Sequence, residues 1–304
     1  MTQPATREPA IEHVFVRANG LRFHVAQCGE GDRLALCLHG FPEAWISWRN
    51  QIPLLARLGY RVWAPDLRGY GESERPAEMQ SYAIETLLGD VAGLIDASGA
   101  RSTLLMAHDW GAIIAWYFAM RRLRPLEKLV ILNVPHPGAA AKAFRSWKQL
   151  SRSWYAIFFQ IPRLPEFLLT RGEGRPLTRV FRTGTQHPEN FPEAVIENYR
   201  RSWLTPGAAS AMVNYYRALV RGGGAARQRK LGFPVIETPT LFLWGEQDVA
   251  LIKETTFGTE RWVKNLTLRY LPEASHFVQQ DAPEEVNAML EAWLSGRPVP
   301  GAQS

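Results

Sequence analysis

The residue types and spacing around Asp109 indicate nucleophilic chemistry. Asp109 follows the apolar run 102–107 and precedes 110–121, an apolar run compatible with a helix. A buried strand that passes directly into a helix, with the small residues Ala107 and Gly111 flanking the turn, is typical of a nucleophile elbow. An Asp here also fits a simpler role as the N-terminal cap of the helix, and this stretch by itself favours neither interpretation.

Two more polar residues follow predicted strands in the order that a catalytic triad needs. Asp248 comes after the strand predicted at 240–244, and His276 comes after the one at 266–271. Functional groups gather at the carboxyl ends of strands in an open α/β sheet, and the chain order nucleophile, acid, histidine is that of an α/β-hydrolase triad. Each residue alone could be a turn aspartate or a structural histidine. Together with Asp109 they predict a triad.

Two other residues compete for the position of the acid. Asn133 ends the strand predicted at 128–132, but its amide cannot carry the charge that an imidazolium requires. Glu246 lies close to Asp248 in the sequence, and we rank it below Asp248.

The motif His-Gly-Phe-Pro at residues 39–42 supplies a further part of the site. The backbone N–H groups of Phe41 and of Trp110, the residue after the nucleophile, would form an oxyanion hole. We expect the side chains of His39 and His108 to be structural, with His39 holding its loop and His108 pointing away from the site.

A carboxylate in the nucleophile position, in place of serine, determines the class of reaction. Attack of Asp109 on an acyl group would give an anhydride, and forming this intermediate would bring little catalytic advantage. Attack on an electrophilic sp³ carbon gives an ordinary ester, which water activated by His276 can hydrolyse. The helix N-terminus stabilises the carboxylate. The substrate therefore carries a leaving group on carbon, either an epoxide oxygen or a halide.

The elements that must position these residues follow from the hydrophobic pattern. Two alternating segments around Asn19-Gly20 predict a hairpin. The other predicted strands are 34–38, 60–65, 102–107, 128–132, 240–244 and 266–271, and the predicted helices are about 47–58, 82–97, 110–121 and 283–295. This alternation predicts an α/β fold with a mostly parallel sheet and helices on both faces.

Residues 139–230 interrupt the alternation. They show no strand pattern and are rich in Trp, Tyr, Phe, Arg and Pro. We predict that they form a helical cap, or lid, inserted after the sixth strand, and that residues 1–138 and 231–304 form the core domain. Within the insertion, the glycine-rich stretch 221–230 has the composition of a flexible connection.

Composition places the chain among ordinary globular proteins. Of its 304 residues, 46% are hydrophobic and 21% charged, and the net charge is +6. The basic residues are scattered and accompany no recognition motif, so we expect no nucleic-acid partner. Cys28 and Cys37 are too few for a disulfide framework. No secretory signal is visible, and no apolar run approaches the ~20 residues that span a bilayer, so we expect a soluble, cytoplasmic protein.

Three motifs make the chain similar to a known family. Residues 39–48, 66–73 and 108–112 resemble the α/β-hydrolase-fold epoxide hydrolases, and the likeness covers nearly the whole chain, cap included. The resemblance implies an α/β-hydrolase fold and an enzyme that opens an epoxide to a vicinal diol through an ester on Asp109. It implies a small apolar epoxide and water as reactants, with no metal ion or organic cofactor, and it leaves a homodimer open.

The same family uses two cap tyrosines to polarise and protonate the epoxide oxygen, a role that suits a neutral acid. Tyr155 resembles the first of them and Tyr216 the second, with Tyr215 the neighbour most easily confused with it. We expect Tyr155 and Tyr216, together with Phe41 and Trp110, to contact the substrate.

Other functions stay open at the level of the sequence. A haloalkane dehalogenase shares the Asp–His–acid chemistry, but it needs two halide N–H donors, one of them often an Asn where Phe41 stands. A fluoroacetate-type dehalogenase favours Arg where Trp110 stands, and Asp109 disfavours a serine esterase. From a different class, an inactive α/β hydrolase would serve as a receptor for a small molecule; turnover of styrene oxide would separate an enzyme from a receptor.

Overall fold

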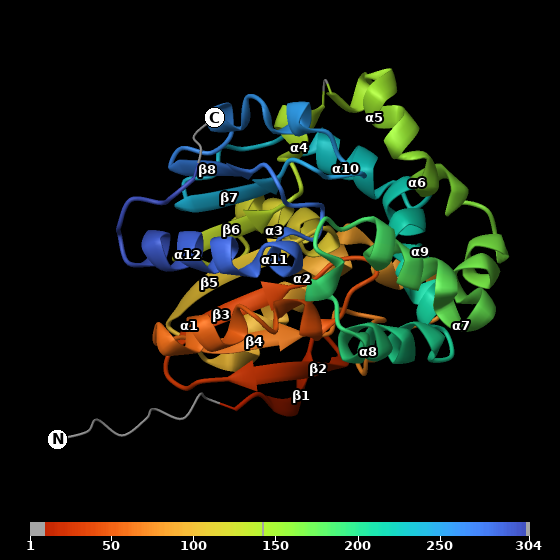
Figure 1. Cartoon of the computed structure of the whole chain (residues 1–304), viewed down its shortest axis with the longest axis horizontal. Coiled ribbons are helices and arrows are strands. Elements are labelled where there is room, and N and C mark those ends of the chain that lie inside the picture. The colour runs from red at the N-terminus through yellow and green to blue at the C-terminus, as the bar shows by residue number, and fades with distance from the viewer. Residues whose placement is uncertain (1–9, 142, 302–304) are drawn as a thin grey trace.

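The strands of the molecule form one twisted sheet (Figure 1). The computed structural model describes residues 10–141 and 143–301, and in these residues the sheet has eight strands in the order β1-β2-β4-β3-β5-β6-β7-β8. The strands are β1 (Glu12–Ala18), β2 (Leu21–Cys28), β3 (Arg33–Leu38), β4 (Arg61–Pro65), β5 (Ser102–His108), β6 (Lys128–Leu132), β7 (Thr240–Gly245) and β8 (Leu266–Leu271). β2 pairs antiparallel with both of its neighbours, and all pairs from β4 to β8 are parallel. The predicted, mostly parallel sheet is confirmed.

Asn19 and Gly20 form the turn of the predicted hairpin between β1 and β2. Their φ angles are 46° and 73°, as a two-residue turn of type I′ requires, and Asn and Gly are the residues that adopt this conformation most readily. The turn brings Ala18 opposite Leu21.

Helices cover both faces of the sheet. Those outside the segment between β6 and β7 are α1 (Ile52–Arg57), α2 (Ile84–Ser98), α3 (Trp110–Arg121), α11 (Val278–Asp281) and α12 (Pro283–Leu294). Successive side chains of a strand point to opposite faces. In β3, Leu36 therefore packs in the core with residues of α2 and α3, whereas Cys37 packs in the core with residues of α1 and α12. Burial on both faces explains why β3 reads as a continuous apolar run.

The helix expected at about 47–58 is divided in two. A 3-10 helix spans Trp45–Trp48 and α1 begins at Ile52, with Pro53 as its second residue. Proline has no backbone N–H and fits only the first turn of a helix, so one continuous helix cannot run through this position.

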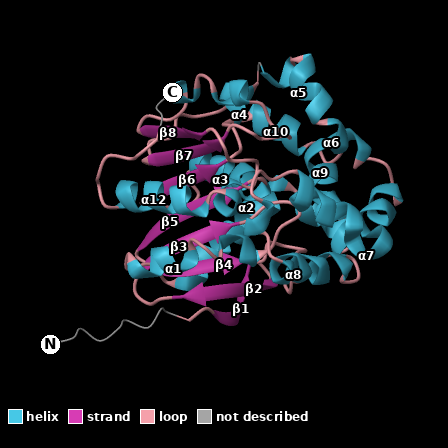
Figure 2. Cartoon of the chain, viewed as in Figure 1, coloured by secondary structure: helices cyan, strands magenta, loops and turns pink. Residues whose placement is uncertain are grey.

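Helices joined by loops make up the chain between β6 and β7 among the described residues, with no strand among them, as Figure 2 shows by colour. The α-helices are α4 (Pro137–Ala140), α5 (Trp147–Arg152), α6 (Trp154–Phe158), α7 (Leu164–Thr183), α8 (Glu193–Leu204), α9 (Ala208–Val220) and α10 (Gly224–Lys230). α7 is interrupted by non-helical backbone at 171–174. None of the helices described is long and apolar enough to cross a bilayer.

The glycine-rich stretch 221–230 is not the flexible connection that its composition indicates. Most of it forms α10, and Arg227 of this helix pairs with Glu85 of α2 at 2.8 Å. The expectation is wrong because it considers only local composition, whereas the partner that fixes the stretch lies far away in the sequence.

The inserted helices lie over the loops that follow three of the parallel strands. Trp203 of α8 donates through Nε1 to the carbonyl of Pro42, at 2.6 Å. Tyr215 of α9 donates to the carbonyl of Arg68, at 2.8 Å. These two loops follow β3 and β4. Gln149 of α5 likewise donates to a carbonyl, that of Ala250, in the loop after β7. The segment therefore covers the edge of the sheet where the predicted site residues lie.

Candidate active site

Asp109 occupies the sharp turn between β5 and α3. Its backbone has φ 46° and ψ −121°, a conformation that costs about 1–3 kcal/mol in a residue other than glycine and that occurs often at functional sites. The turn requires small neighbours: a Cβ atom on Gly111 would collide with the carbonyl of Leu38, and one on Gly40 would collide with the Asp109 side chain. This strand–turn–helix arrangement has the geometry of a nucleophile elbow.

The carboxylate of Asp109 does not cap α3. Its Oδ1 atom accepts a hydrogen bond from the backbone N–H of Phe41 at 2.6 Å, and its Oδ2 atom lies 3.5 Å from Nε2 of His276. The side chain therefore faces the loops after β3 and β8, and the capping interpretation is wrong.

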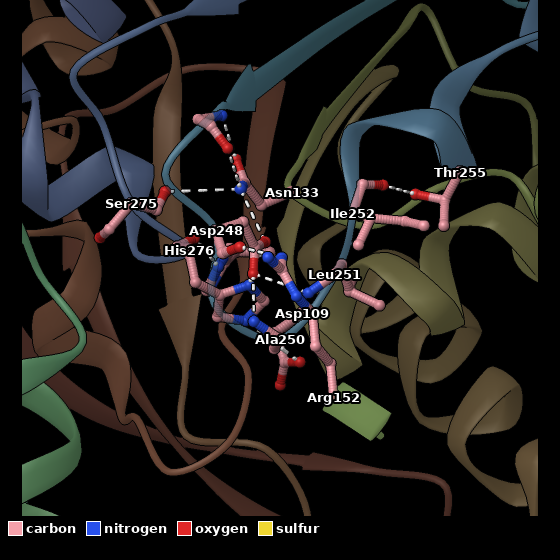
Figure 3. Close-up of polar contacts among 12 residues, drawn as sticks. Asp109, Asn133, Arg152, Asp248, Ala250, Leu251, Ile252, Thr255, Ser275 and His276 are labelled. Atoms are coloured by element: carbon pink, nitrogen blue, oxygen red, sulfur yellow. Dashed lines mark hydrogen bonds and ion pairs between the residues drawn. The ribbon is translucent and has the colours of Figure 1, made fainter. Parts of the chain in front are cut away.

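His276 lies between two carboxylates, as Figure 3 shows. Its Nδ1 atom is 2.7 Å from Oδ2 of Asp248, while Nε2 faces Asp109. The Asp248 side chain is fully buried, and its Oδ1 atom accepts from the backbone N–H groups of Ala250 and Leu251 at 2.7 and 2.9 Å. Asp248 is thus both a turn aspartate and the partner of the histidine, and the structure brings together all three residues of the predicted triad.

The three charges stabilise one another. Burial disfavours a charged His276, but the carboxylates of Asp248 and Asp109 outweigh burial and raise the pKa of His276 well above its usual value. Burial also disfavours charged carboxylates, but the imidazolium and its hydrogen bonds outweigh it and lower the pKa of both Asp109 and Asp248. The two carboxylates therefore favour the protonated form of His276 in the resting site.

One of the two predicted oxyanion donors contacts the Asp109 carboxylate. The N–H of Phe41 already donates to it, and Trp110 is the first residue of α3, whose backbone N–H has no partner within the helix. His39 holds the Phe41 loop, because its Nε2 accepts from the N–H of Leu67 at 3.0 Å and its Nδ1 donates to the carbonyl of Gly40 at 2.9 Å. This is the structural role expected of His39.

Tyr155 on α6 and Tyr216 on α9 form an aromatic cluster with the oxyanion loop. Their ring centroids are 5.9 Å apart, and Tyr216 lies 5.6 Å from the ring of Phe41 and 4.9 Å from that of Trp110. Burial and the negative charge of Asp109 raise the pKa of both tyrosines. A raised pKa favours the neutral phenol, which is the form that can donate a proton.

Tyr215 has a different environment from its neighbour. It is fully buried, donates to the carbonyl of Arg68 and packs against Tyr70 and Tyr82. Its hydroxyl is thus engaged in holding α9 to the core, so of the two adjacent tyrosines Tyr216 is the one placed beside Asp109.

The two residues that compete with Asp248 for the position of the acid do not contact His276. Asn133 donates through Nδ2 to Oδ2 of Asp248 at 2.9 Å and accepts from the N–H of Gly245 at 2.8 Å, so it supports the acid instead of replacing it. Glu246 pairs with Lys253 at 2.6 Å. The ranking of Asp248 above both residues agrees with this geometry.

Sequence reasoning missed a buried carboxylate behind the site. Glu43 is fully buried and accepts hydrogen bonds from the N–H of Gly40 and from the amides of Gln279 and Gln280. It also lies 2.8 Å from Nδ1 of His108, whose Nε2 donates to the carbonyl of His276. Glu43 therefore links the oxyanion loop to the histidine loop, and His108 points away from the site as expected.

Two contacts from α5 also escaped the sequence reasoning. Gln149, fully buried, donates to the carbonyl of Ala250 and accepts from the N–H of Ile252, at 2.9 and 3.0 Å. Arg152 donates to the carbonyl of Asp248 at 2.7 Å (Figure 3). The insertion thus fixes the loop that carries the acid. No local motif marks either residue.

Metal ligands do not gather in the part of the chain that the structure describes. Residues 10–141 and 143–301 contain no group of three or more His, Cys, Asp or Glu side chains placed to hold an ion.

Comparisons with known proteins agree with this architecture. A family model described as alpha/beta hydrolase fold matches residues 36–283. Epoxide hydrolase 4 of Mus musculus is 38% identical over 93% of this chain and 79% of its own length, and the AB hydrolase superfamily protein YfhM of Bacillus subtilis is 37% identical over 93% of this chain and 98% of its own length. A crystal structure of a Bacillus megaterium epoxide hydrolase variant superposes with a TM-score of 0.85 at 32% identity, covering 93% of this chain and all of that one.

The fold and the site together define an α/β hydrolase. Within that class, the similarity to enzymes from mouse and Bacillus megaterium extends over nearly the whole chain. The chain belongs to the epoxide hydrolase family of the alpha/beta hydrolase fold, and it is a hydrolase.

Proposed function

We propose that this protein hydrolyses apolar epoxides to vicinal diols through an ester on Asp109. One observation carries the proposal: the Asp109 carboxylate lies 3.5 Å from His276, and the ring of Tyr216 packs against Phe41 and Trp110 and lies 5.9 Å from that of Tyr155. A nucleophile, a base and two acids are the groups that ring opening through an ester needs. The names of the relatives support the same activity.

In the first step, Oδ2 of Asp109 is the attacking atom, because Oδ1 is held by the N–H of Phe41. Oδ2 forms a bond to one epoxide carbon, and the carbon–oxygen bond of the ring breaks. The electron pair moves to the epoxide oxygen, which takes a proton from Tyr155 or Tyr216. A halide leaving group would need no proton, so the tyrosine pair favours an epoxide over a haloalkane.

In the second step, His276 activates water. Formation of the ester removes the negative charge of Asp109, which is one of the two charges that raise the pKa of His276. The histidine then releases its proton more readily, and this proton restores the tyrosine that was deprotonated in the first step. The neutral imidazole can take a proton from water, while Asp248 stabilises the imidazolium that results. Hydroxide adds to the ester carbon, and the N–H groups of Phe41 and Trp110 stabilise the oxyanion. The bond between the ester carbon and the substrate oxygen then breaks, and the leaving alkoxide takes a proton from the imidazolium to complete the diol. The proton of the released Asp109 carboxyl group returns to His276.

We propose that residues 139–230 act as a cap domain over a core of 1–138 and 231–304. The cap supplies both tyrosines, and its helix α5 holds the loop of the acid through Gln149 and Arg152. A cap of this kind excludes water from the first step, in which water would compete with Asp109 for the epoxide.

The test is turnover of styrene oxide by the purified protein, with a bromoalkane as the competing substrate. We expect diol from styrene oxide, little bromide release, and no diol from Asp109→Ala. Bromide release without diol formation would contradict the proposed substrate. Normal diol formation by Asp109→Ala would contradict the ester.

A further inference from the structure

The outer edge of the cap exposes a row of large apolar side chains. Sixteen large apolar residues are exposed among the described residues, and half of them lie between positions 144 and 167. The most exposed are Trp147 (83%), Ile157 (74%), Phe167 (63%) and Trp154 (62%). An exposed apolar patch of this extent on a globular protein marks an interaction surface.

The row follows a helical repeat. We define the cap rim as the seven residues Trp147, Leu150, Trp154, Ile157, Ile161, Leu164 and Phe167, each three or four positions after the one before. Of the residues between them, Gln149 and Phe159 are buried, whereas Lys148 and Arg163 are exposed. α5, α6 and α7 therefore carry exposed apolar side chains, and Figure 1 shows these helices at the outer edge of the molecule, away from the sheet.

Basic residues accompany the cap rim along the chain. Residues 144–179 contain seven Lys or Arg and two Glu. One of these acids, Glu166, is already paired with Arg217 at 2.6 Å. Four arginines are exposed and form no ion pair with any other described residue: Arg163, Arg171, Arg175 and Arg179. The segment thus exposes both an apolar row, the cap rim, and a group of four arginines without ion-pair partners, its cationic border.

This combination favours an anionic lipid surface over a second copy of the chain. Lipid headgroups of negative charge complement the arginines, and tryptophan side chains favour the depth at which headgroups meet acyl chains. A second copy docked on the same rim would bring cationic borders together. Amphipathic helices with basic residues beside Trp, Phe and Leu lie on membranes in this way.

We propose that the cap rim binds the surface of anionic membranes. The docked rim and the candidate active site lie on opposite sides of one short helix, because α6 carries Trp154 and Ile157 outward while Tyr155 faces the cluster around Asp109. An apolar epoxide dissolved in the membrane would then enter the site from the rim. This last consequence rests on the proposed function, whereas membrane binding does not.

The experiment is flotation of the full chain with vesicles of phosphatidylcholine alone or of phosphatidylcholine with phosphatidylserine. The test variant is Trp147→Ser/Ile157→Ser, and the matched control is Phe15→Ser/Leu231→Ser, which removes exposed apolar side chains of similar size outside the rim (47% and 61% exposed). A third variant, Arg163→Gln/Arg171→Gln, removes charge from the border. Sedimentation of each protein without lipid reports its oligomeric state.

We expect the wild-type protein and the control to float with the phosphatidylserine vesicles. The rim variant should bind roughly tenfold more weakly or not at all, and the arginine variant should lose the preference for phosphatidylserine. Absence of wild-type binding, or equal binding by the rim variant, would overturn the proposal. A wild-type dimer that the rim substitutions dissociate would assign the surface to a second copy instead. Because flotation requires no turnover, an inactive enzyme would leave this result unaffected.

Discussion

Nε2 of His276 lies 3.5 Å from Oδ2 of Asp109, whereas Nδ1 of the same ring lies 2.7 Å from Oδ2 of Asp248. The contact with Asp248 is short enough for a strong hydrogen bond, whereas the contact with Asp109 is longer than a usual hydrogen bond. Asp248 therefore fixes the orientation of the ring, and Asp109 acts on it mainly through charge. This difference leaves Asp109 available to form a new bond while the histidine stays in place.

Asp109→Asn should lower the pKa of His276. The variant keeps the shape of the side chain but removes one of the two negative charges that outweigh burial and raise this pKa. A pH titration of the imidazole signals by NMR, with the wild-type protein and His276→Gln to assign the resonance, measures the change. The same loss of charge occurs when the ester forms, so an unchanged pKa would argue against the proposed switch of His276 from acid to base.

His276→Gln should trap the ester. Ring opening needs Asp109 and a tyrosine, but hydrolysis needs the imidazole to take a proton from water. After incubation with styrene oxide, mass spectrometry should find one substrate added to the peptide that contains Asp109. An unmodified peptide in this variant, together with normal turnover by the wild type, would place the histidine in the first step.

Replacing Tyr155 and Tyr216 together should suppress ring opening far more than either change alone. Each phenol lies near Asp109 and near the other, so one can donate a proton when the other is Phe. Single-turnover rates of Tyr155→Phe, Tyr216→Phe and the double variant measure the effect, with a loss of roughly 10²–10⁴-fold expected when general acid catalysis is removed. Tyr215→Phe is the control, since its hydroxyl holds α9 to Arg68. Normal rates in the double variant would show that other groups supply the proton.

Glu43→Ala should destabilise the fold by about 3–5 kcal/mol, the typical cost of removing one partner from a buried charged network. The change leaves the N–H of Gly40 and two buried glutamine amides without their acceptor. Urea unfolding measures the free energy. Glu254→Ala is the matched control, because Glu254 pairs with Lys148 on the surface and such pairs contribute less than about 1 kcal/mol. Equal stability of the two variants would contradict the role given to Glu43.

The sequence predicts the sheet and the positions of the three charged residues because the relevant signals are local. The apolar runs on either side of Asp109 define the elbow. Position 111 requires a small residue because the carbonyl of Leu38 lies close to it. Asp248 and His276 follow strands of the same parallel sheet, so the topology alone brings their loops to one edge.

The supporting contacts could not be predicted in this way. Glu43 meets Gln279 across 236 positions and Arg152 meets the Asp248 loop across 96. Such pairs depend on how the inserted helices pack on the core, and hydrophobic periodicity carries no information about that packing. The choice between Tyr215 and Tyr216 depended on the same packing, because adjacent residues on α9 point in different directions.

The most direct test of the account is one turnover of excess enzyme in heavy-oxygen water. If Oδ2 of Asp109 bonds to the substrate carbon, the first diol carries an ordinary oxygen from the protein, and the heavy isotope appears in the Asp109 side chain. A first diol that contains the solvent isotope, with an unlabelled Asp109, would show that water attacks the epoxide directly and would contradict the ester mechanism.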